Sequence, residues 1–459
     1  MTITRRSILR SGALLGAGAA IPMSLGAMPA LAQQSGYKAL VCVFFAGGLD
    51  GHDCVIPYDA ASYAEYEAVR RTLIATYDAE PGLRGSRSRE ALVPLTSSDP
   101  SASGSRRFAL APQMADLAPL FSGGRLSIVS NVGPLVEPTD RAAMDAGRVR
   151  LPPRLMSHND QQSLWQTMQT EGANTGWGGR MSDALFANSP FATVSASGNS
   201  TFLAGRASRG YQIGTFGAVQ VSSADGFPFG SNQIAAALRE HYQAESGVNN
   251  LFARDIAQIQ ADSVATSREL AALWNSTNAG SGASVPGNGL SGGLATVART
   301  ISLRQQLGVN RQVFFVQAGG FDSHITQAKG LPGLQRMIAS ALAAFQAELD
   351  RMGVADSVTT FTASDFGRTL QSNASGTDHG WGNHHFVMGG AVKGGRIVGD
   401  FPRTVLGHGQ DFGRGRLIPT TSIEQYAGDL GRWFGLSEGA LGDVFPNRGR
   451  FDTAGLGLF

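Results

Sequence analysis

Residues 39–53 read ALVCVFFAGGLDGHD, and this stretch decides the fold. Residues 39–46 are continuously apolar and rich in β-forming types, which indicates a strand buried on both faces. Two glycines, Gly47 and Gly48, end this strand and lead directly into a polar run that closes with Asp53. Strands of this kind are typical of parallel sheets, because helices cover both faces of such a sheet.

The same pattern recurs along the chain. Further apolar, β-rich runs are Leu126–Val132, Gln312–Ala318 and Ser357–Ala363. Helical periodicity separates them, at Ala111–Phe121, Gln161–Gln169, Asn232–Gln243, Leu251–Trp274, Leu294–Gln306 and Leu334–Met352. Alternating strands and helices predict an α/β fold with a mainly parallel central sheet that helices cover on both sides.

The composition is that of a folded protein with a sizeable core. The chain has 459 residues, of which 42% are hydrophobic and 16% are charged. Its 37 Lys and Arg residues nearly balance 35 Asp and Glu residues, so the charge does not indicate a nucleic-acid partner. Length alone leaves one or two domains open. The stretch Asn188–Phe229, with short runs and many glycines, could form a small antiparallel cap.

The first 32 residues have the features of an export signal. A twin arginine, Arg5 and Arg6, precedes a weakly apolar stretch that ends in the A-x-A sequence of residues 30–32. This pattern predicts a Tat signal peptide, the Tat export machinery as a partner, and a periplasmic or secreted protein with no membrane anchor after cleavage. The two cysteines, Cys42 and Cys54, are expected to stay unpaired, because Cys42 lies inside a strand that carries the chain away from Cys54.

Polar clusters follow three of the apolar runs. They are Gly47–Asp53, Gly319–His324 and Ser364–Arg368, and a further cluster contains Asp378 and His379. Ligands in open α/β sheets bind beyond the carboxyl ends of the strands, so these clusters are expected to form one site. His384 and His385 follow shortly, and as neighbours in a strand at most one of them should face that site.

The residue types in these clusters are typical of a metal site. The candidate ligands are Asp50, Asp322, His324, Asp365, Asp378 and His379. Carboxylate and imidazole ligands together suit zinc or manganese, and carboxylates alone suit magnesium or calcium. One or two divalent ions are therefore expected, although an aspartate after glycine is also a common turn or helix-cap residue. Asp378 could either bind a metal or orient His379.

Two further residues are candidates for catalysis. Ser157 lies at a predicted helix start, where backbone N–H groups favour an anion, and its hydroxyl could attack phosphorus or sulfur. The alternative is that Ser157 caps the helix, since the sequence Ser-x-x-Asp is close to a capping box. Arg368 could clamp an anionic oxygen, or pair with a carboxylate.

Together these motifs resemble one bacterial family. The motifs are FFAGGLDG (44–51), SHNDQQSLWQT (157–167), GGFDSH (319–324), SDFGRT (364–369) and GTDHGWGNHHFVMGGAVKGG (376–395). They are similar to those of the Tat-exported proteins catalogued as domain of unknown function fifteen-oh-one. That family is grouped with the alkaline phosphatase and sulfatase superfamily.

The resemblance implies a three-layer α/β/α sandwich with metals at the carboxyl ends of the strands. It implies a single alkaline phosphatase-like domain over residues 33–459, with a possible cap insertion around 188–290. By the same resemblance, Asp50 and Asp365 would hold one metal. Asp322, His324 and His379 would hold a second.

Two functions are compatible with these features. The first is an exported metal-dependent hydrolase of phosphate or sulfate esters, with Ser157 or a water molecule as the attacking group. Its substrate would be a small molecule or a polymer. The alternative is a secreted binding or assembly protein without catalytic activity, in which any metal stabilises the fold.

Overall fold

The apolar run that opens the fold is strand β1 (Lys38–Phe45), and it lies in the middle of the central sheet. The computed structural model describes residues 36–80, 85–97, 106–185, 189–214, 217–218, 231–245, 250–276 and 289–459. The expected export signal, residues 1–32, lies outside these ranges. Residues Tyr37–Phe459 group as one structural unit.

The central sheet is mixed and mostly parallel. Within the described residues its ten strands follow the order β14-β5-β13-β10-β1-β9-β6-β7-β8, with β15 also paired to β5. The strands are β1, β5 (Leu126–Gly133), β6 (Thr193–Ser195), β7 (Tyr211–Gly214), β8 (Gly217–Ala218), β9 (Arg311–Ala318), β10 (Val358–Ser364), β13 (Asn383–Met388), β14 (Ile397–Val398) and β15 (Thr421–Ser422). β1 pairs in parallel with β9 and β10, whereas β13 runs antiparallel between β10 and β5. The predicted mainly parallel sheet is confirmed.

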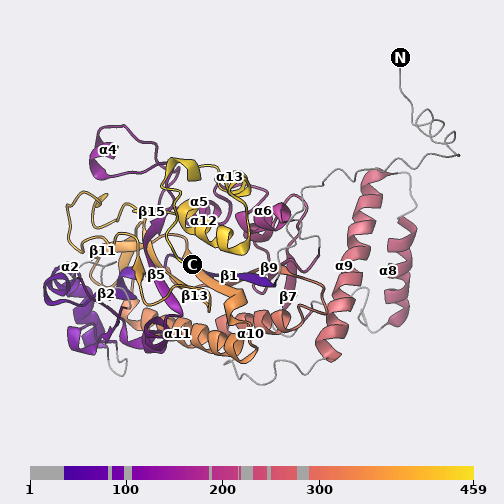
Figure 1. Cartoon of the computed structure of the whole chain (residues 1–459), viewed down its shortest axis with the longest axis horizontal. Helices are drawn as coiled ribbons and strands as arrows, with labels where there is room; N and C mark the ends of the chain where they lie inside the picture. The colour runs from indigo at the N-terminus through magenta and orange to yellow at the C-terminus, as the bar shows by residue number, and fades with distance from the viewer. Residues whose placement is uncertain are drawn as a thin grey trace, which may run out of the picture. The chain divides into compact units, whose positions relative to one another are not determined.

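Helices cover both faces of the sheet (Figure 1). The helices of the described residues are α2 (Ala60–Ala79), α3 (Ala118–Ser122), α4 (Arg141–Asp145), α5 (His158–Thr167), α6 (Trp177–Ala184), α8 (Asn232–Glu245), α9 (Leu251–Ser276), α10 (Gly289–Ser302), α11 (Gln327–Arg351), α12 (Ile423–Phe434) and α13 (Glu438–Val444). Alternate residues of β1 enter different cores, since side chains of a strand point to opposite faces. Val41 packs in the core that includes α10 and α11, and Cys42 packs in the core that includes α6, α12 and α13. The fold is therefore the expected α/β/α sandwich.

Two small sheets lie outside the central one. One joins β2 (Val55–Pro57), β3 (Val93–Pro94) and β4 (Phe108–Leu110). The other is the hairpin of β11 (Arg368–Ser372) and β12 (Thr377–His379), which carries Arg368 and His379. Because β11 follows β10 almost directly, the hairpin lies at the end of the central sheet where β10 finishes.

Two expectations differ from the structure. Residues 112–117 form a 3-10 helix that leads into the short α3, because Pro119 has no N–H to donate within a continuous α-helix over this stretch. In the region expected to form an antiparallel cap, β6 and β7 extend the central sheet in parallel, and the described antiparallel pairing there is β7 with β8. Asn188 and residues 219–230 lie outside the described residues.

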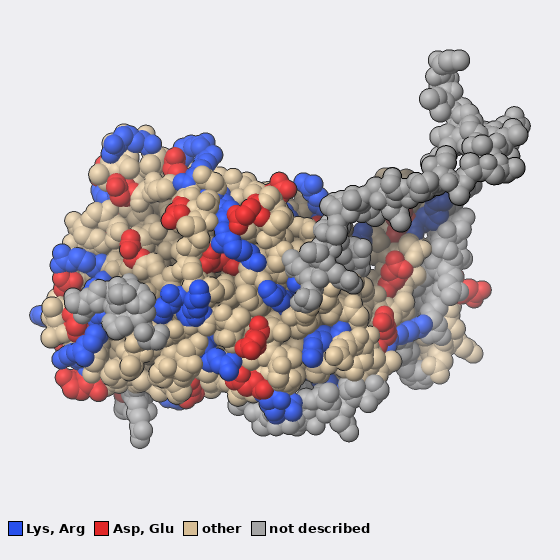
Figure 2. All heavy atoms as spheres, viewed as in Figure 1, with Lys and Arg blue, Asp and Glu red and all other residues tan. Residues whose placement is uncertain are grey.

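One other expectation holds. Cys42 and Cys54 are both buried free thiols, as predicted. In the described part of the chain, no helix combines the length and the apolar character that a membrane span requires. On the face seen in Figure 2, basic and acidic side chains are interspersed over the surface.

Candidate metal centre

The carboxyl ends of three neighbouring strands meet at the same level of the sheet. Phe45, near the end of β1, pairs with Ala318 on β9 and with Ser364 on β10. The polar segments after these strands therefore lie side by side, as the sequence predicts. The contact is close, because a Cβ on Gly47 would lie 2.6 Å from the backbone nitrogen of Asp322. Gly47 also has a φ of +117°, so only glycine fits here without strain.

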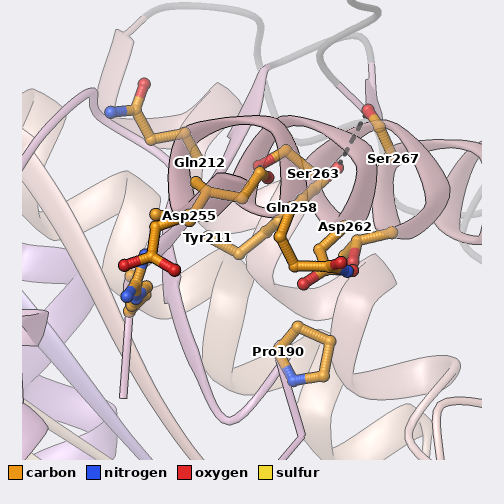
Figure 3. Close-up of a pocket in the computed structure, with 12 residues that line it drawn as sticks. Pro190, Tyr211, Gln212, Asp255, Gln258, Asp262, Ser263 and Ser267 are labelled. Carbon is orange, nitrogen blue, oxygen red and sulfur yellow. Dashed lines mark hydrogen bonds between the residues drawn. The ribbon is translucent and has the colours of Figure 1, made fainter. Parts of the chain in front are cut away.

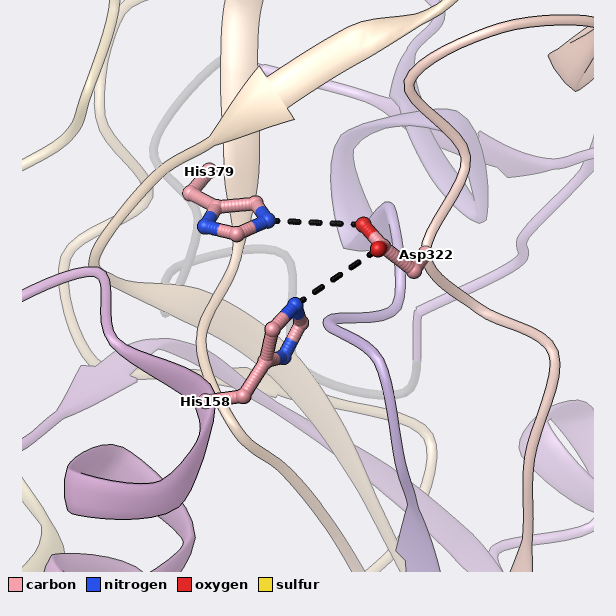
Figure 4. Close-up of side chains that lie close together, drawn as sticks. All are labelled: His158, Asp322 and His379. Atoms are coloured by element: carbon pink, nitrogen blue, oxygen red, sulfur yellow. Dashed lines mark hydrogen bonds and ion pairs between the residues drawn. The ribbon is translucent and has the colours of Figure 1, made fainter.

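Two histidines face one carboxylate above this edge (Figure 4). His158 begins α5, Asp322 follows β9, and His379 ends β12. The Nε2 atom of His158 lies 3.6 Å from Oδ2 of Asp322, and Nε2 of His379 lies 3.4 Å from Oδ1. One potential ligand atom from each residue lies within 4.8 Å of the others. The three side chains can therefore hold one metal ion.

A third histidine joins this group. His324 Nε2 lies 2.8 Å from His379 Nε2 and 3.2 Å from Asp322 Oδ1. At this separation one ring donates an Nε2–H hydrogen bond to the Nε2 atom of the other. A metal ion bound here would take the place of that proton.

The opposite ring nitrogens fix how the three imidazoles are oriented. His379 Nδ1 donates to the carbonyl of Met156 at 2.8 Å, and His158 Nδ1 donates to Asp365 Oδ2 at 2.6 Å. His324 Nδ1 faces Asp378 Oδ1 at 3.4 Å. With Nδ1 engaged, the neutral ring has its lone pair on Nε2, which is the arrangement of metal-binding histidines in proteins. All three Nε2 atoms lie on the side of Asp322.

Strained backbone flanks the histidines on two sides. Met156 has a φ of +68° and Thr326 has a φ of +57°, both in the left-handed region that non-glycine residues rarely adopt. Met156 supplies the carbonyl that orients His379, and Thr326 follows His324 by two residues. Such strain concentrates at functional sites.

Electrostatics favour the protonation states that bind metal. Burial lowers the pKa of His379, and the positive charge of Arg368 lowers it further. Burial acts to raise the pKa of Asp322, but a hydrogen bond and the charge of Arg368, together with His324 and His158, bring it below its usual value. A neutral imidazole and an ionised carboxylate are the forms that bind a metal ion.

The donor set fits a divalent transition metal. Bonds of about 2.0–2.1 Å to a tetrahedral ion place the ligand atoms about 3.3 Å from one another. Asp322 Oδ1 lies 3.2 Å from His324 Nε2 and 3.4 Å from His379 Nε2, and Asp322 Oδ2 lies 3.6 Å from His158 Nε2. His324 Nε2 and His379 Nε2, 2.8 Å apart, would have to separate slightly to bind the same ion. Imidazole and carboxylate ligands together suit zinc or manganese. The Asp322 side chain is 49% exposed and that of His324 is 42% exposed, so solvent and small molecules can reach the group.

Arg368 lies beneath the centre, and all three nitrogens of its guanidinium donate hydrogen bonds. It donates to the carbonyls of Gly47, Gly48, Phe321 and Thr377, and to Asp322 Oδ1 at 2.7 Å. The side chain is completely buried. Arg368 therefore joins the loops that follow β1 and β9 to β12, which agrees with the carboxylate-pairing alternative, and its burial keeps the guanidinium away from solvent.

Asp50 lies apart from the histidines. Arg70 binds both of its oxygens, at 2.6 and 3.0 Å, and Gln327 donates to Oδ2 at 2.8 Å. Asp50 and Arg70 are both completely buried. The structure thus pairs Asp50 with an arginine, whereas the resemblance places it with Asp365 around a metal.

Asp365 and Asp378 lie behind the imidazoles. Asp365 Oδ2 accepts hydrogen bonds from His158, from Gln162 Nε2 at 3.0 Å and from the Gly47 amide at 3.2 Å. Its Oδ1 is buried and has no partner among the described residues. Asp378 contacts His324, as well as Arg414 at 3.0 Å. Of the two alternatives for Asp378, the contacts favour orienting a histidine, but that histidine is His324.

Ser157 is at the N-terminus of α5, as predicted, yet its hydroxyl does not cap the helix. Ser157 Oγ donates to Asp160 Oδ2 at 2.7 Å, within the first turn. The other oxygen of Asp160 contacts Arg154 at 3.3 Å. The serine therefore lies next to His158 and is bonded to a carboxylate that can accept its proton.

His384 and His385 point to opposite sides of β13, as expected. His384 accepts from the Asn131 amide on Nδ1 and therefore donates from Nε2 to His52 Nδ1, at 3.0 Å. His385 packs edge-on against Trp165 with the ring centroids 4.9 Å apart. Both histidines are buried in the core, where these contacts give them a structural role.

His158 was not among the ligands predicted from the sequence, although the structure places it in the candidate metal group. Its position directly after Ser157, at a helix start already assigned to the site, was the available signal. Asp322, His324 and His379, which the sequence analysis grouped together, are also together in the structure.

A cavity of about 860 Å³ lies elsewhere, between β7 and α9 (Figure 3). Tyr211 and Gln212 line it from β7, and Asp255 and Asp262 line it from α9. The described residues that form it include none of the side chains of the candidate metal centre. The predicted chemistry therefore belongs to the strand-end site.

Fold and site together define an α/β protein with a candidate His/Asp metal group at the carboxyl ends of its strands. The chain belongs to the family described as "Protein of unknown function (DUF1501)", whose model matches residues 37–444. No curated protein matches the sequence. A crystal structure of an alkaline phosphatase PafA variant with four substitutions is similar over 72% of this chain, at 13% sequence identity and a TM-score of 0.23. The match covers 63% of that phosphatase chain, which is less than two thirds of its length.

Proposed function

We propose that this protein is an exported metal-dependent hydrolase of phosphate or sulfate esters. One observation carries the proposal: ligand atoms of His158, Asp322 and His379 lie within 4.8 Å of one another at the carboxyl ends of the strands, and His324 contacts both Asp322 and His379. His158, His324 and His379 would hold the ion with Asp322. A divalent ion in this position supplies Lewis acidity and neutralises negative charge on the reacting group.

The charges around the group favour an anionic substrate. Arg414 is half-exposed and contacts Asp378, which in turn contacts His324. Arg154 is exposed on the other side, near the start of α5. Each guanidinium can donate a pair of hydrogen bonds to a phosphate or sulfate group. The N-terminus of α5 adds backbone N–H groups that favour an anion.

Ser157 is the proposed nucleophile. Its hydroxyl would form a bond to phosphorus or sulfur while the ester bond to the leaving alcohol breaks, and the serine proton would pass to Asp160 and from there to the oxygen of the leaving alcohol. Asp160 is within hydrogen-bond reach of this proton, as a general base must be. Water would then release phosphate or sulfate and restore the serine.

Export by the Tat pathway is part of the proposal. It rests on the twin arginine and the A-x-A sequence of the first 32 residues. Fusion of residues 1–32 to a reporter that folds in the cytoplasm tests it, with an Arg5→Lys/Arg6→Lys variant as the control. Export of the parent fusion and retention of the variant are the expected results.

Hydrolysis is tested with the mature protein, stripped of metal and then reloaded with zinc or manganese. The substrates are p-nitrophenyl phosphate, bis-p-nitrophenyl phosphate and p-nitrophenyl sulfate. Turnover of at least one of them, at least 100-fold lower without metal and in Asp322→Asn, is the expected result. A protein that binds metal but cleaves none of the esters would instead be the secreted binding or assembly protein.

A further inference from the structure

Gln327 connects the buried Asp50–Arg70 pair to the loops of the metal centre. Its Nε2 donates to Asp50 Oδ2 at 2.8 Å. Its Oε1 accepts from Thr377 Oγ1 at 2.7 Å and from Ser323 Oγ at 3.2 Å. Both ends of one amide are therefore engaged, and the side chain is 1% exposed.

The two hydroxyls that Gln327 binds lie beside the proposed ligands. Ser323 stands between Asp322 and His324, and Thr377 precedes Asp378 and His379. The Thr377 amide also donates to the Ser323 carbonyl at 3.2 Å, which joins the two segments directly. A single side chain thus bonds to both segments that carry the group.

The backbone of Gln327 is held as firmly as its side chain. Gln327 is the first residue of α11, and its amide donates to the Ser375 carbonyl at 2.9 Å. On the far side, Arg70 neutralises Asp50 and also donates to the Thr369 carbonyl at 3.0 Å. A buried ion pair of this kind has one arrangement, because a shift leaves a charge without its partner.

We propose that Gln327 is a positioning residue of the metal centre, through which the Asp50–Arg70 pair fixes the segments that carry Asp322, His324 and His379. The inference rests on the metal centre of the proposed function. In this arrangement Asp50 affects metal binding indirectly, because it accepts the hydrogen bond that holds the Gln327 side chain. Partners behind the ligands of a metal site typically contribute about 10–100-fold to metal affinity.

The same helix offers a matched control. Gln335 is also buried on α11, and it donates to the Asp53 carbonyl at 2.8 Å and accepts from Arg87 at 2.7 Å. Its bonds belong to the Asp53–Arg87 pair, outside the segments of the centre. Gln335→Met should therefore lower stability as Gln327→Met does, without acting on the ligands.

The experiment measures zinc affinity of the mature full chain by competition with a chromogenic chelator, together with Tm. Gln327→Met is expected to raise the Kd for zinc about 10–100-fold, whereas Gln335→Met changes it less than about threefold at a comparable loss of Tm. Equal zinc affinities in the two variants would overturn the inference while leaving the metal centre intact. A wild-type chain that binds no zinc would overturn the metal centre and this inference together.

A second pair of variants covers the case in which Gln327→Met does not fold. Thr377→Val removes the hydroxyl that Gln327 accepts from, and Thr377→Ser keeps it. Weaker zinc binding in Thr377→Val, restored in Thr377→Ser, is the expected pattern. Equal affinity in both would contradict the positioning role.

Discussion

His158 Nδ1 lies 2.6 Å from Asp365 Oδ2, so a buried carboxylate at the end of β10 orients an imidazole at the start of α5. This contact ties a helix to the end of the sheet and directs Nε2 of the ring toward Asp322. It also explains why an aspartate that directly follows a strand need not bind the metal itself. In the proposed centre, its role is to select the tautomer of the histidine that would bind the metal.

Loss of this contact should weaken metal binding. Asp365→Asn keeps the size of the side chain but removes the charge that holds the Nδ1 proton, and we expect the Kd for zinc to rise about 10–100-fold. The control is Asp429→Asn, which removes a buried carboxylate on α12 that is bonded to Arg432 and to the Leu456 amide. Unchanged zinc affinity in Asp365→Asn would contradict the role of the pair.

Substitution of Arg70 should lower the free energy of unfolding and leave the number of bound metal ions unchanged. Arg70→Met leaves the Asp50 carboxylate buried without its partner, which typically costs about 3–5 kcal/mol of unfolding free energy. Arg71→Met, at the exposed neighbouring position, should change stability by less than about 0.5 kcal/mol. Denaturant unfolding measures both. A second metal ion bound in wild type and lost in Asp50→Asn would show that Asp50 is a ligand after all.

Ser157→Ala tests the nucleophile. We expect kcat to fall at least 100-fold with metal content unchanged, because the serine bonds to Asp160 and touches none of the proposed ligands through its hydroxyl. Ser163→Ala, on the same helix, is the control and should keep full activity. Retained turnover in Ser157→Ala would mean that a water molecule attacks the ester directly.

Acid should destabilise the fold through its buried histidines. Burial lowers the pKa of His52 and of His385 to about 3 each, and it lowers that of His384 well below the usual value. The unfolded chain binds protons at these residues near pH 6.5 and the folded chain does not. Stability is therefore complete above pH 6.5 and falls as the pH drops below it, by up to about 1.4 kcal/mol per pH unit for each histidine.

The slope of stability against pH measures this effect. Between pH 6 and pH 5, His385→Phe should reduce the slope of unfolding free energy against pH by the contribution of one histidine, up to about 1.4 kcal/mol per pH unit. This holds whatever the effect of the substitution on stability at pH 8. An unaltered slope in His385→Phe would mean that this imidazole is protonated in the folded state.

The architecture could be predicted because its signal is local. The apolar runs before Gly47, Gly319 and Asp365 each form a strand of the sheet, and the alternation with helices sets the parallel order. Pro119 was visible too, but its effect on the helix was not anticipated. The short strands β6 and β7 carry too few residues for their pairing to be read from the chain.

The site was predictable only in part, because partners are chosen in three dimensions. Asp322, His324 and His379 lie in strand-end segments and were found. His158 was not predicted, because its partner Asp365 lies 207 residues further along the chain and the sequence does not show that the two meet. The pairing of Asp50 with Arg70 and the burial of Arg368 depend on how α2 and the loops pack, which the residue types alone do not specify.

The most direct measurement is the metal content of the mature protein, purified without chelator and analysed by elemental mass spectrometry. The proposed centre predicts about one zinc or manganese ion per chain, lost in His158→Ala/His379→Ala and kept in His241→Ala. A chain that binds no metal even after reconstitution would contradict the proposed centre. The same holds if the His158→Ala/His379→Ala variant keeps its ion.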